Sequence, residues 1–129
     1  MFEKYMIVPE EARNTRVGDE VTGFQFGARL PYYRGLGLSM VEDIQVKVDG
    51  RPVEPDCIRL TVHGHSYSLP ELEAEADDRW EMGEVAIVSI DQNGGLPAGE
   101  HTVELLINLR ISYLPFPAIR QASKTITIQ

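Results

Sequence analysis

The chain has 129 residues, a single cysteine (Cys57) and a formal net charge of −8. This length fits one domain, residues 1–129, with a core that needs no cross-links, and a lone cysteine excludes an internal disulfide. The acidic balance disfavours nucleic acid and anionic membranes, which require basic patches, and no apolar run is long enough for a signal peptide or a membrane span, so we expect a cytoplasmic protein.

The first third of the chain predicts two strands. Residues 2–8 form a short strand closed by Pro9, and residues 10–20 are interpreted as a polar loop or a turn of helix. Residues 21–30 form the second strand, because alternate positions on one of its faces are apolar. It breaks at 31–38, a loop that combines tyrosines, an arginine and leucines with glycines that permit unusual backbone angles.

The middle of the chain predicts a hairpin, a strand and the only helix. A strand over 44–48 runs into Asp49-Gly50, the strongest short hairpin signal in the sequence. A fourth strand over 58–63 again alternates apolar and polar residues. Ser68 can cap a short helix that starts with Pro70 in its first turn and ends near Glu75.

The last third predicts a strand over 84–90, a long strand from about His101 to Tyr113, and a terminal strand over 124–128. The long strand ends where Pro115 and Pro117 remove backbone donors. The complete pattern predicts an all-β fold, an antiparallel β-sandwich of immunoglobulin or fibronectin type with one short helix. A jelly roll or a partly closed barrel remains an alternative.

Few residues offer catalytic chemistry. His63 and His65 are two apart at a strand end and would share one face, so with His101 and a nearby carboxylate they could hold a metal. Histidines in a turn are more often hydrogen-bonding surface groups. Cys57 has no basic neighbour in sequence that would activate it as a nucleophile, and no serine lies in a strand-to-helix elbow. We therefore assign no catalytic residue, metal or cofactor to this chain.

Two other features have structural interpretations. The carboxylates between residues 71 and 78 are interpreted as a solvated helix face and its trailing loop. Trp80 is the only tryptophan, and we interpret it as a packing residue rather than a platform for a sugar ring.

Two strand ends, 29–38 and 110–117, each combine arginine and tyrosine with proline or glycine. If both lie at one end of the sandwich, they form a patch of residue types that are enriched at the centres of protein interfaces. The alternative is that these side chains plug the end of the sandwich. The predicted interface residues are Tyr32, Tyr33, Arg34, Leu36, Arg110, Tyr113, Leu114 and Phe116.

Seven short segments carry a further signal: Phe24-Gln25-Phe26, Arg29 to Gly35, Val46 to Gly50, Thr61 to Gly64, Arg79-Trp80 with Gly83, Leu96 to His101, and Arg110 to Pro117. In this order, and in a chain of this length, they resemble the small β subunit of bacterial C-glycoside deglycosidases. The likeness extends from about Phe2 to Pro117.

The resemblance implies a two-subunit carbon–carbon lyase. Its α subunit would be a TIM barrel similar to sugar-phosphate isomerases and epimerases, carrying the catalytic residues and a divalent metal, Mn or Mg. The implied substrates are 3-oxo-glucosides of plant polyphenols, joined through carbon and sometimes through oxygen. In the implied elimination, the 3-oxo group acidifies the C2 proton, a base removes it, and the metal stabilises the enediolate while the aglycone leaves.

For this chain the resemblance implies a non-catalytic β subunit that supports the α subunit in a higher-order αβ oligomer. His63 lies in a matching segment and is the one residue that could reach the partner's substrate pocket. One alternative is a free-standing carbohydrate-binding module in which Trp80, Tyr32 and Tyr113 stack on sugar rings. The other is a small metalloenzyme built on the three histidines.

Overall fold

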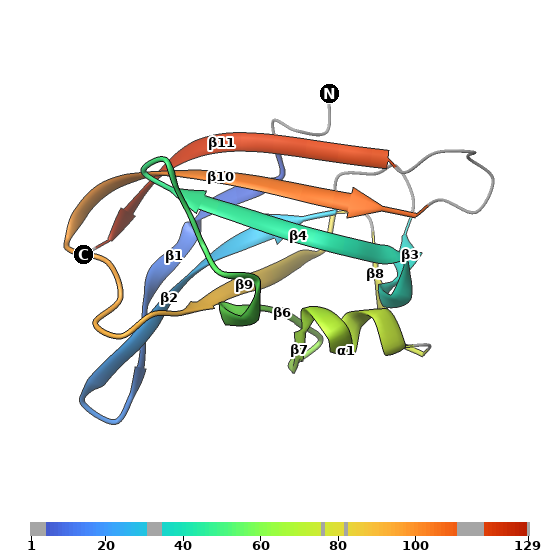
Figure 1. Ribbon diagram of the computed structural model, residues 1–129, viewed down its shortest axis with the longest axis horizontal. Helices are drawn as coiled ribbons and strands as arrows, with labels where there is room; N and C mark the ends of the chain where they lie inside the picture. The colour runs from blue at the N-terminus through green and yellow to red at the C-terminus, as the bar shows by residue number, and fades with distance from the viewer. Residues whose placement is uncertain (1–4, 31–34, 76, 82, 111–117, 129) are drawn as a thin grey trace.

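The computed structural model describes residues 5–30, 35–75, 77–81, 83–110 and 118–128. These residues form two antiparallel sheets that face each other, with a small third sheet at one end (Figure 1). One sheet has the strand order β1 (Ile7–Val17), β2 (Glu20–Arg29), β9 (Val85–Asp91), β6 (Ile58–Val62) and β7 (His65–Ser68). The other has the order β11 (Ala118–Ile128), β10 (Gly99–Leu109), β4 (Val41–Val48) and β5 (Arg51–Pro52).

The remaining described elements are short. The third sheet pairs β3 (Leu36–Gly37) with β8 (Arg79–Trp80). Two single 3-10 turns, η2 (Leu38–Met40) and η3 (Pro55–Cys57), and one helix, α1 (Leu69–Ala74), complete them. The predicted fold class, an antiparallel all-β sandwich with one short helix, is confirmed.

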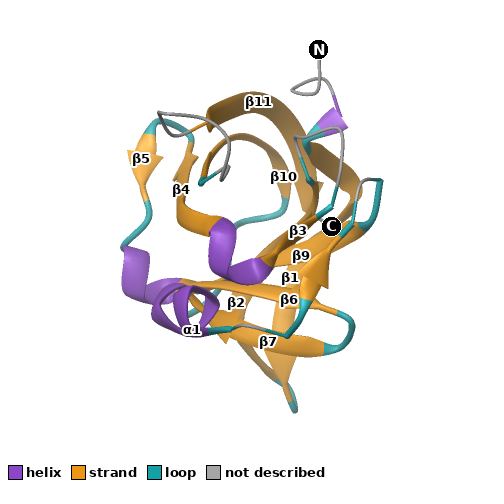
Figure 2. Ribbon diagram, turned by 90° about the vertical axis from the view of Figure 1, so that its right-hand side faces the viewer, coloured by secondary structure: helices purple, strands orange, loops and turns teal. Residues whose placement is uncertain are grey.

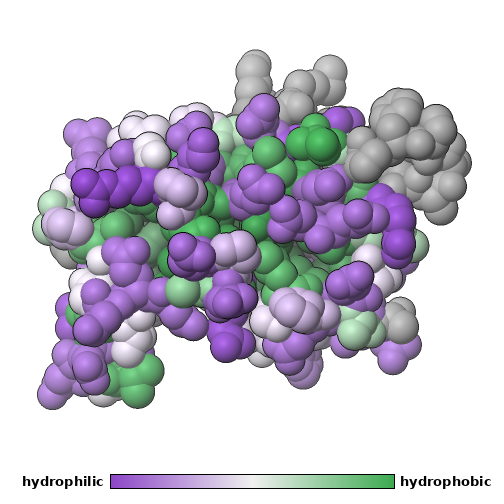
Figure 3. All heavy atoms as spheres, viewed as in Figure 1, coloured by the Kyte–Doolittle hydropathy of each residue, from purple (hydrophilic) through white to green (hydrophobic). Residues whose placement is uncertain are grey.

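The core lies between the two sheets and follows the alternation of the sequence. Along β10, Val103, Leu105 and Ile107 are buried, whereas Glu104 between them is exposed. Phe24 and Phe26 of β2 are fully buried within the same cluster. Each such side chain contributes about 1.5–3 kcal/mol through burial, so the faces of the strands are fixed by this pattern. Hydrophilic side chains predominate on the outer face seen in Figure 3.

The interpretation of residues 10–20 as a loop or helical turn is wrong. β1 continues to Val17 and pairs with β2 through a turn at Gly18-Asp19. β1 is an edge strand of its sheet and lies against β11, the edge of the other sheet. Because only part of an edge strand is buried, its alternation is weak, and Pro9 is tolerated beside a register shift that follows Val8.

The predicted helix is confirmed as α1. Ser68 is its N-cap, and the Ser68 hydroxyl accepts a 3.4 Å bond from the Glu71 amide while the Glu71 carboxylate accepts a 2.9 Å bond from the Ser68 amide. Leu72 is buried and holds the helix against β4, β6, β7 and η2. α1 therefore covers the side of the sandwich opposite the β1–β11 contact (Figure 2).

The other strands follow the predictions in part: the first strand begins at Ile7 instead of residue 2, and β7 was not predicted. The Asp49-Gly50 hairpin is confirmed between β4 and β5, with φ of 51° and 83° at its two turn residues. β11 is longer than the predicted 124–128 strand, and the two-residue strands of the third sheet were too short to predict. The proposed extension of β10 beyond residue 110 lies outside the described residues.

In the described part of the chain, no helix has the length and apolar character needed to cross a membrane.

Candidate functional site at the His63 end of the sandwich

The described members of the predicted interface flank the end of the sandwich formed by β3, β8 and η2. Leu36 is half-buried and pairs with Trp80 in the third sheet. The Arg110 amide donates a 2.8 Å bond to the Met40 carbonyl of η2, so the end of β10 lies beside the segment that carries Leu36 (Figure 1). The other six predicted interface residues, Tyr32, Tyr33, Arg34, Tyr113, Leu114 and Phe116, lie outside the described residues, and the interface stays a prediction.

Arg110 already has an acidic neighbour in its own chain. Its Nε lies 3.6 Å from Glu42 Oε1, and both side chains are exposed. An exposed pair at this separation contributes little to stability, so Arg110 keeps the freedom to contact another protein.

His63 does not continue strand β6, contrary to the prediction. Val62 pairs with His65, so His63 and Gly64 form the two-residue turn of the β6–β7 hairpin, with φ of 53° and 80°. The glycine makes this turn possible because both central residues need positive φ. His63 and His65 therefore do not share one face of a strand, and the spacing argument for a two-histidine chelate fails.

Both ring nitrogens of His63 face carboxylates. Nδ1 lies 2.8 Å from Asp78 Oδ1 and Nε2 lies 2.7 Å from Glu84 Oε2. An ionised carboxylate can only accept hydrogen bonds, so the ring can donate to both carboxylates only when both of its nitrogens are protonated. The hydrogen bond with Asp78, and then that with Glu84, raises the pKa of His63 above its ordinary value. The side chain is 44% exposed.

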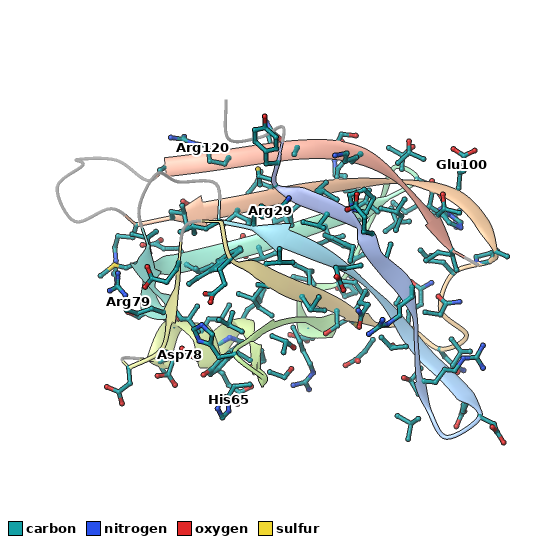
Figure 4. All side chains as sticks on the ribbon, turned by 180° about the vertical axis from the view of Figure 1, so that it is seen from behind. Arg29, His65, Asp78, Arg79, Glu100 and Arg120 are labelled. Carbon is teal, nitrogen blue, oxygen red and sulfur yellow. The ribbon has the colours of Figure 1, made fainter. Side chains whose placement is uncertain are left out.

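These carboxylates are also held by their neighbours. Asp78 Oδ2 accepts a 2.9 Å bond from the Tyr67 hydroxyl. The bond from His63, and then that from Tyr67, lowers the pKa of Asp78. Burial and the bond to Asp78 raise the pKa of Tyr67 to about 12. We call His63, Tyr67, Asp78 and Glu84 the His63 cluster. Figure 4 labels Asp78 together with its neighbours Arg79 and His65.

Trp80 lies in the chain between the two carboxylates of the His63 cluster. It is fully buried, and its indole Nε1 donates a 2.9 Å bond to the Glu84 carbonyl. The interpretation as a packing residue is confirmed. Since no face of the ring is accessible, Trp80 cannot stack on a sugar, and the carbohydrate-binding alternative loses its only described aromatic platform.

His101 belongs to a different part of the molecule. Its Nδ1 lies 2.7 Å from Asp49 Oδ2 and its Nε2 lies 2.7 Å from the Pro97 carbonyl, so it bridges the β4–β5 turn and the loop before β10. The bond with Asp49, and then that with Pro97, raises the pKa of His101. The three histidines therefore do not converge. Among the described residues, no group of three or more His, Cys, Asp or Glu side chains could hold a metal ion.

A cavity of about 730 Å³ lies beside His101. Its walls include Cys57 and the buried side chains of Ile90 and Leu96. Asp49 and Pro97 occupy both nitrogens of His101, so the thiol and the ring do not form a nucleophile–base pair.

Only His63 of this cluster was singled out from the sequence. Tyr67 was not considered, Asp78 was interpreted as part of a solvated acidic face, and Glu84 as the start of a strand. The carboxylates that hold His63 are 15 and 21 residues away, so no local spacing connects them. The pairing of β6 with β9 brings Glu84 to His63, and Asp78 reaches the ring from the segment before β8.

A family model described as the C-glycoside deglycosidase beta subunit matches residues 2–113. The chain belongs to this family. It is 35% identical to the C-glycoside deglycosidase beta subunit of Eubacterium cellulosolvens over 88% of this chain and 78% of the relative. It is 36% identical to the 3'-dehydrocarminate deglycosidase beta subunit of a Microbacterium species, over 89% and 83% of the two chains.

A third relative is the C-glycoside deglycosidase beta subunit of Arthrobacter globiformis, which is 28% identical over 83% of this chain and 82% of its own. The resemblance noted in the seven segments is thus confirmed as family membership. The name beta subunit implies at least one partner subunit.

Proposed function

We propose that this chain is the small, non-catalytic subunit of a heteromeric C-glycoside deglycosidase. The complex would cleave the C–C bond between sugar and aglycone in 3-oxo-C-glucosides of plant polyphenols. The family match over residues 2–113 is the observation that carries this proposal. The name of the Microbacterium relative contains 3'-dehydrocarminate, and we extend a ketone-bearing sugar of this kind to the substrate of the present complex.

In this proposal the reaction takes place on a TIM-barrel α subunit in the cytoplasm, within an oligomer of αβ units. A divalent metal bound there would stabilise negative charge that develops when the C2 proton leaves. The arrangement of the present chain supports this division of labour. Both ring nitrogens of His63 and of His101 lie within hydrogen-bond distance of groups of their own chain, so neither ring has a free nitrogen to act as a general base.

The contribution of this chain would be to present a rigid end to its partner. β3, β8 and η2 form this end, and Leu36 and Arg110 flank it. The buried Trp80 and the His63 cluster fix the segment between β8 and β9 beneath it. Such preorganisation lowers the entropy lost on association, because little of the surface has to be ordered by the partner.

The test is a reconstitution. This chain, a candidate α subunit, and the complex of the two after co-expression are each assayed for cleavage of a 3-oxo-C-glucoside. We expect turnover by the complex and none by this chain alone. Robust turnover by the isolated chain would overturn the proposal.

Calorimetric titration of the isolated chain with the same glucoside is the control for a carbohydrate-binding module. We expect no heat of binding in the absence of the α subunit. Tight binding by this chain alone would favour the module instead.

A further inference from the structure

The His63 cluster joins three segments that are separate in the sequence. His63 belongs to the β6–β7 turn, Asp78 directly precedes β8, and Glu84 directly precedes β9. Tyr67 adds a bond from β7 to the same Asp78 carboxylate. The segment between the two carboxylates is β8 with its fully buried Trp80. The His63 ring thus contacts both ends of this segment, and it connects them to the β6–β7 hairpin.

Whether His63 can hydrogen-bond to both Asp78 and Glu84 depends on how many of its ring nitrogens are protonated. An imidazolium has two N–H donors and satisfies both carboxylates. A neutral imidazole has one N–H, so its other nitrogen would turn a lone pair toward a carboxylate that offers no proton. One contact would then change from a charge-assisted hydrogen bond to a repulsion between two acceptors.

We propose that His63 is a proton-operated clamp, which fastens the β8 segment to the β6–β7 hairpin while both ring nitrogens are protonated and releases one side when the ring loses a proton. This inference concerns the isolated chain and does not depend on the proposed enzymatic function.

The surroundings of the ring favour the charged form. Carboxylates face it from the segment before β8 and from the segment before β9, and Tyr67 faces Asp78 from β7. Glu75 accepts from the Asp78 amide, and Glu81 pairs with the nearby cation Arg79 at 2.9 Å. The described charges around the ring are therefore mainly negative, in agreement with the raised pKa of His63.

Two backbone hydrogen bonds depend on the carboxylates that contact His63. The Arg79 amide donates 2.8 Å to Asp78 Oδ1, the carboxylate oxygen that also contacts His63. The Glu81 amide donates 3.1 Å to Glu84 Oε1, on the other carboxylate of the clamp. These two amides report on Asp78 and Glu84 respectively, so amide exchange detects opening on each side.

The experiment follows the His63 ring and these two amides by NMR in the full-length chain as a function of pH. We expect His63 to titrate above the ordinary histidine value. Above that titration, the protection of at least one of the two amides should fall several-fold after correction for the intrinsic rate. The proposal is wrong if the titration midpoint of His63 lies at or below the ordinary histidine value. It is also wrong if the protection of both amides stays constant while His63 titrates.

Substitutions of Asp78, Glu84 and His63 test whether these residues cause the pH step in amide protection. Asp78→Asn and Glu84→Gln should each shift the His63 midpoint downward, and either variant decides the question if the other fails to fold. His63→Asn keeps a residue that tolerates the positive φ but cannot titrate, so the pH step in protection should disappear. A step that persists in His63→Asn overturns the proposal.

His65→Gln is the matched control. His65 lies in the same hairpin and is exposed, and its side chain has no hydrogen-bond partner among the described residues. Its replacement should leave the His63 midpoint and the protection of both amides unchanged. If it abolishes the pH step in protection, the step does not come from His63 and the proposal is wrong.

Discussion

His63 and Asp78 are 15 residues apart in sequence, and their Nδ1 and Oδ1 atoms lie 2.8 Å apart at one end of the sandwich. His101 and Asp49 repeat this relationship toward the Asp49-Gly50 turn, at 2.7 Å. In each pair the carboxylate fixes the ring while the second ring nitrogen donates to another acceptor. Two histidines that the sequence offered as metal ligands thus link separate segments of the chain, and the pKa of each is raised.

These links predict a pH profile for the stability of the isolated chain. The pKa values of His63 and His101 are raised above 6.5, so their contribution is complete below about pH 6.5 and is lost as pH rises through the folded values. The pKa values of Asp49 and Asp78 are lowered from 3.8, so their contribution is present above that value and is lost as pH falls through the folded values.

The free energy of unfolding should therefore be largest between about pH 3.8 and pH 6.5 and decline on both sides. Urea unfolding across this range, at fixed ionic strength, measures it. A stability that keeps rising from pH 6.5 to pH 9 would contradict the assignment of both rings as imidazolium.

Trp80 predicts the largest loss of stability from a single change at this end. Trp80→Ala removes a fully buried indole, so the free energy of unfolding should fall by about 3–5 kcal/mol. Trp80→Phe keeps an aromatic ring but loses the bond to the Glu84 carbonyl, and its loss should be intermediate. Urea denaturation measures both. Equal stability of Trp80→Phe and the wild type would show that the indole N–H contributes nothing.

The cap of α1 allows a smaller and more local prediction. Ser68→Ala removes the hydroxyl that accepts from the Glu71 amide and should reduce stability by about 1 kcal/mol. The same cap lowers the pKa of Glu71, chiefly through the Ser68 amide, which the substitution leaves in place. Ser66→Ala, at an exposed position of β7, is the control and should be neutral. Equal losses for the two serines would assign the effect to strand propensity instead of capping.

The sequence was sufficient where a strand has one buried face. In β10 alternate apolar residues identified the strand and its inward face, because burial of one face imposes a period of two. β2 was identified from its alternating apolar residues as well, although all its residues from Gly23 to Ala28 are buried. The same rule failed for β1, an edge strand in which no residue from Pro9 to Val17 is fully buried, so burial imposes no clear alternation there.

The functional end was only partly predictable. Family resemblance and the hairpin signal are local in sequence, and both were recognised. The His63 cluster depends on the positive φ of His63 and on two carboxylates from other segments. No residue near His63 in sequence specifies these partners, so tertiary pairing alone determines whether the ring is a ligand, a base or a clamp.

The last prediction concerns association with the α subunit. If Tyr32 and Tyr113 are interface anchors, Tyr32→Ala or Tyr113→Ala should weaken association by about 2 kcal/mol, roughly thirtyfold in Kd. Val17→Ser is the control, since Val17 is 73% exposed beside the β1–β2 turn, away from the third sheet (Figure 1). Titration of labelled variants with the α subunit measures the Kd, and thermal unfolding of each isolated variant runs alongside. If the Kd is unchanged and the Tm is lower, the tyrosines stabilise the end of the sandwich and do not contact the α subunit. The docking surface would then lie in another part of the chain.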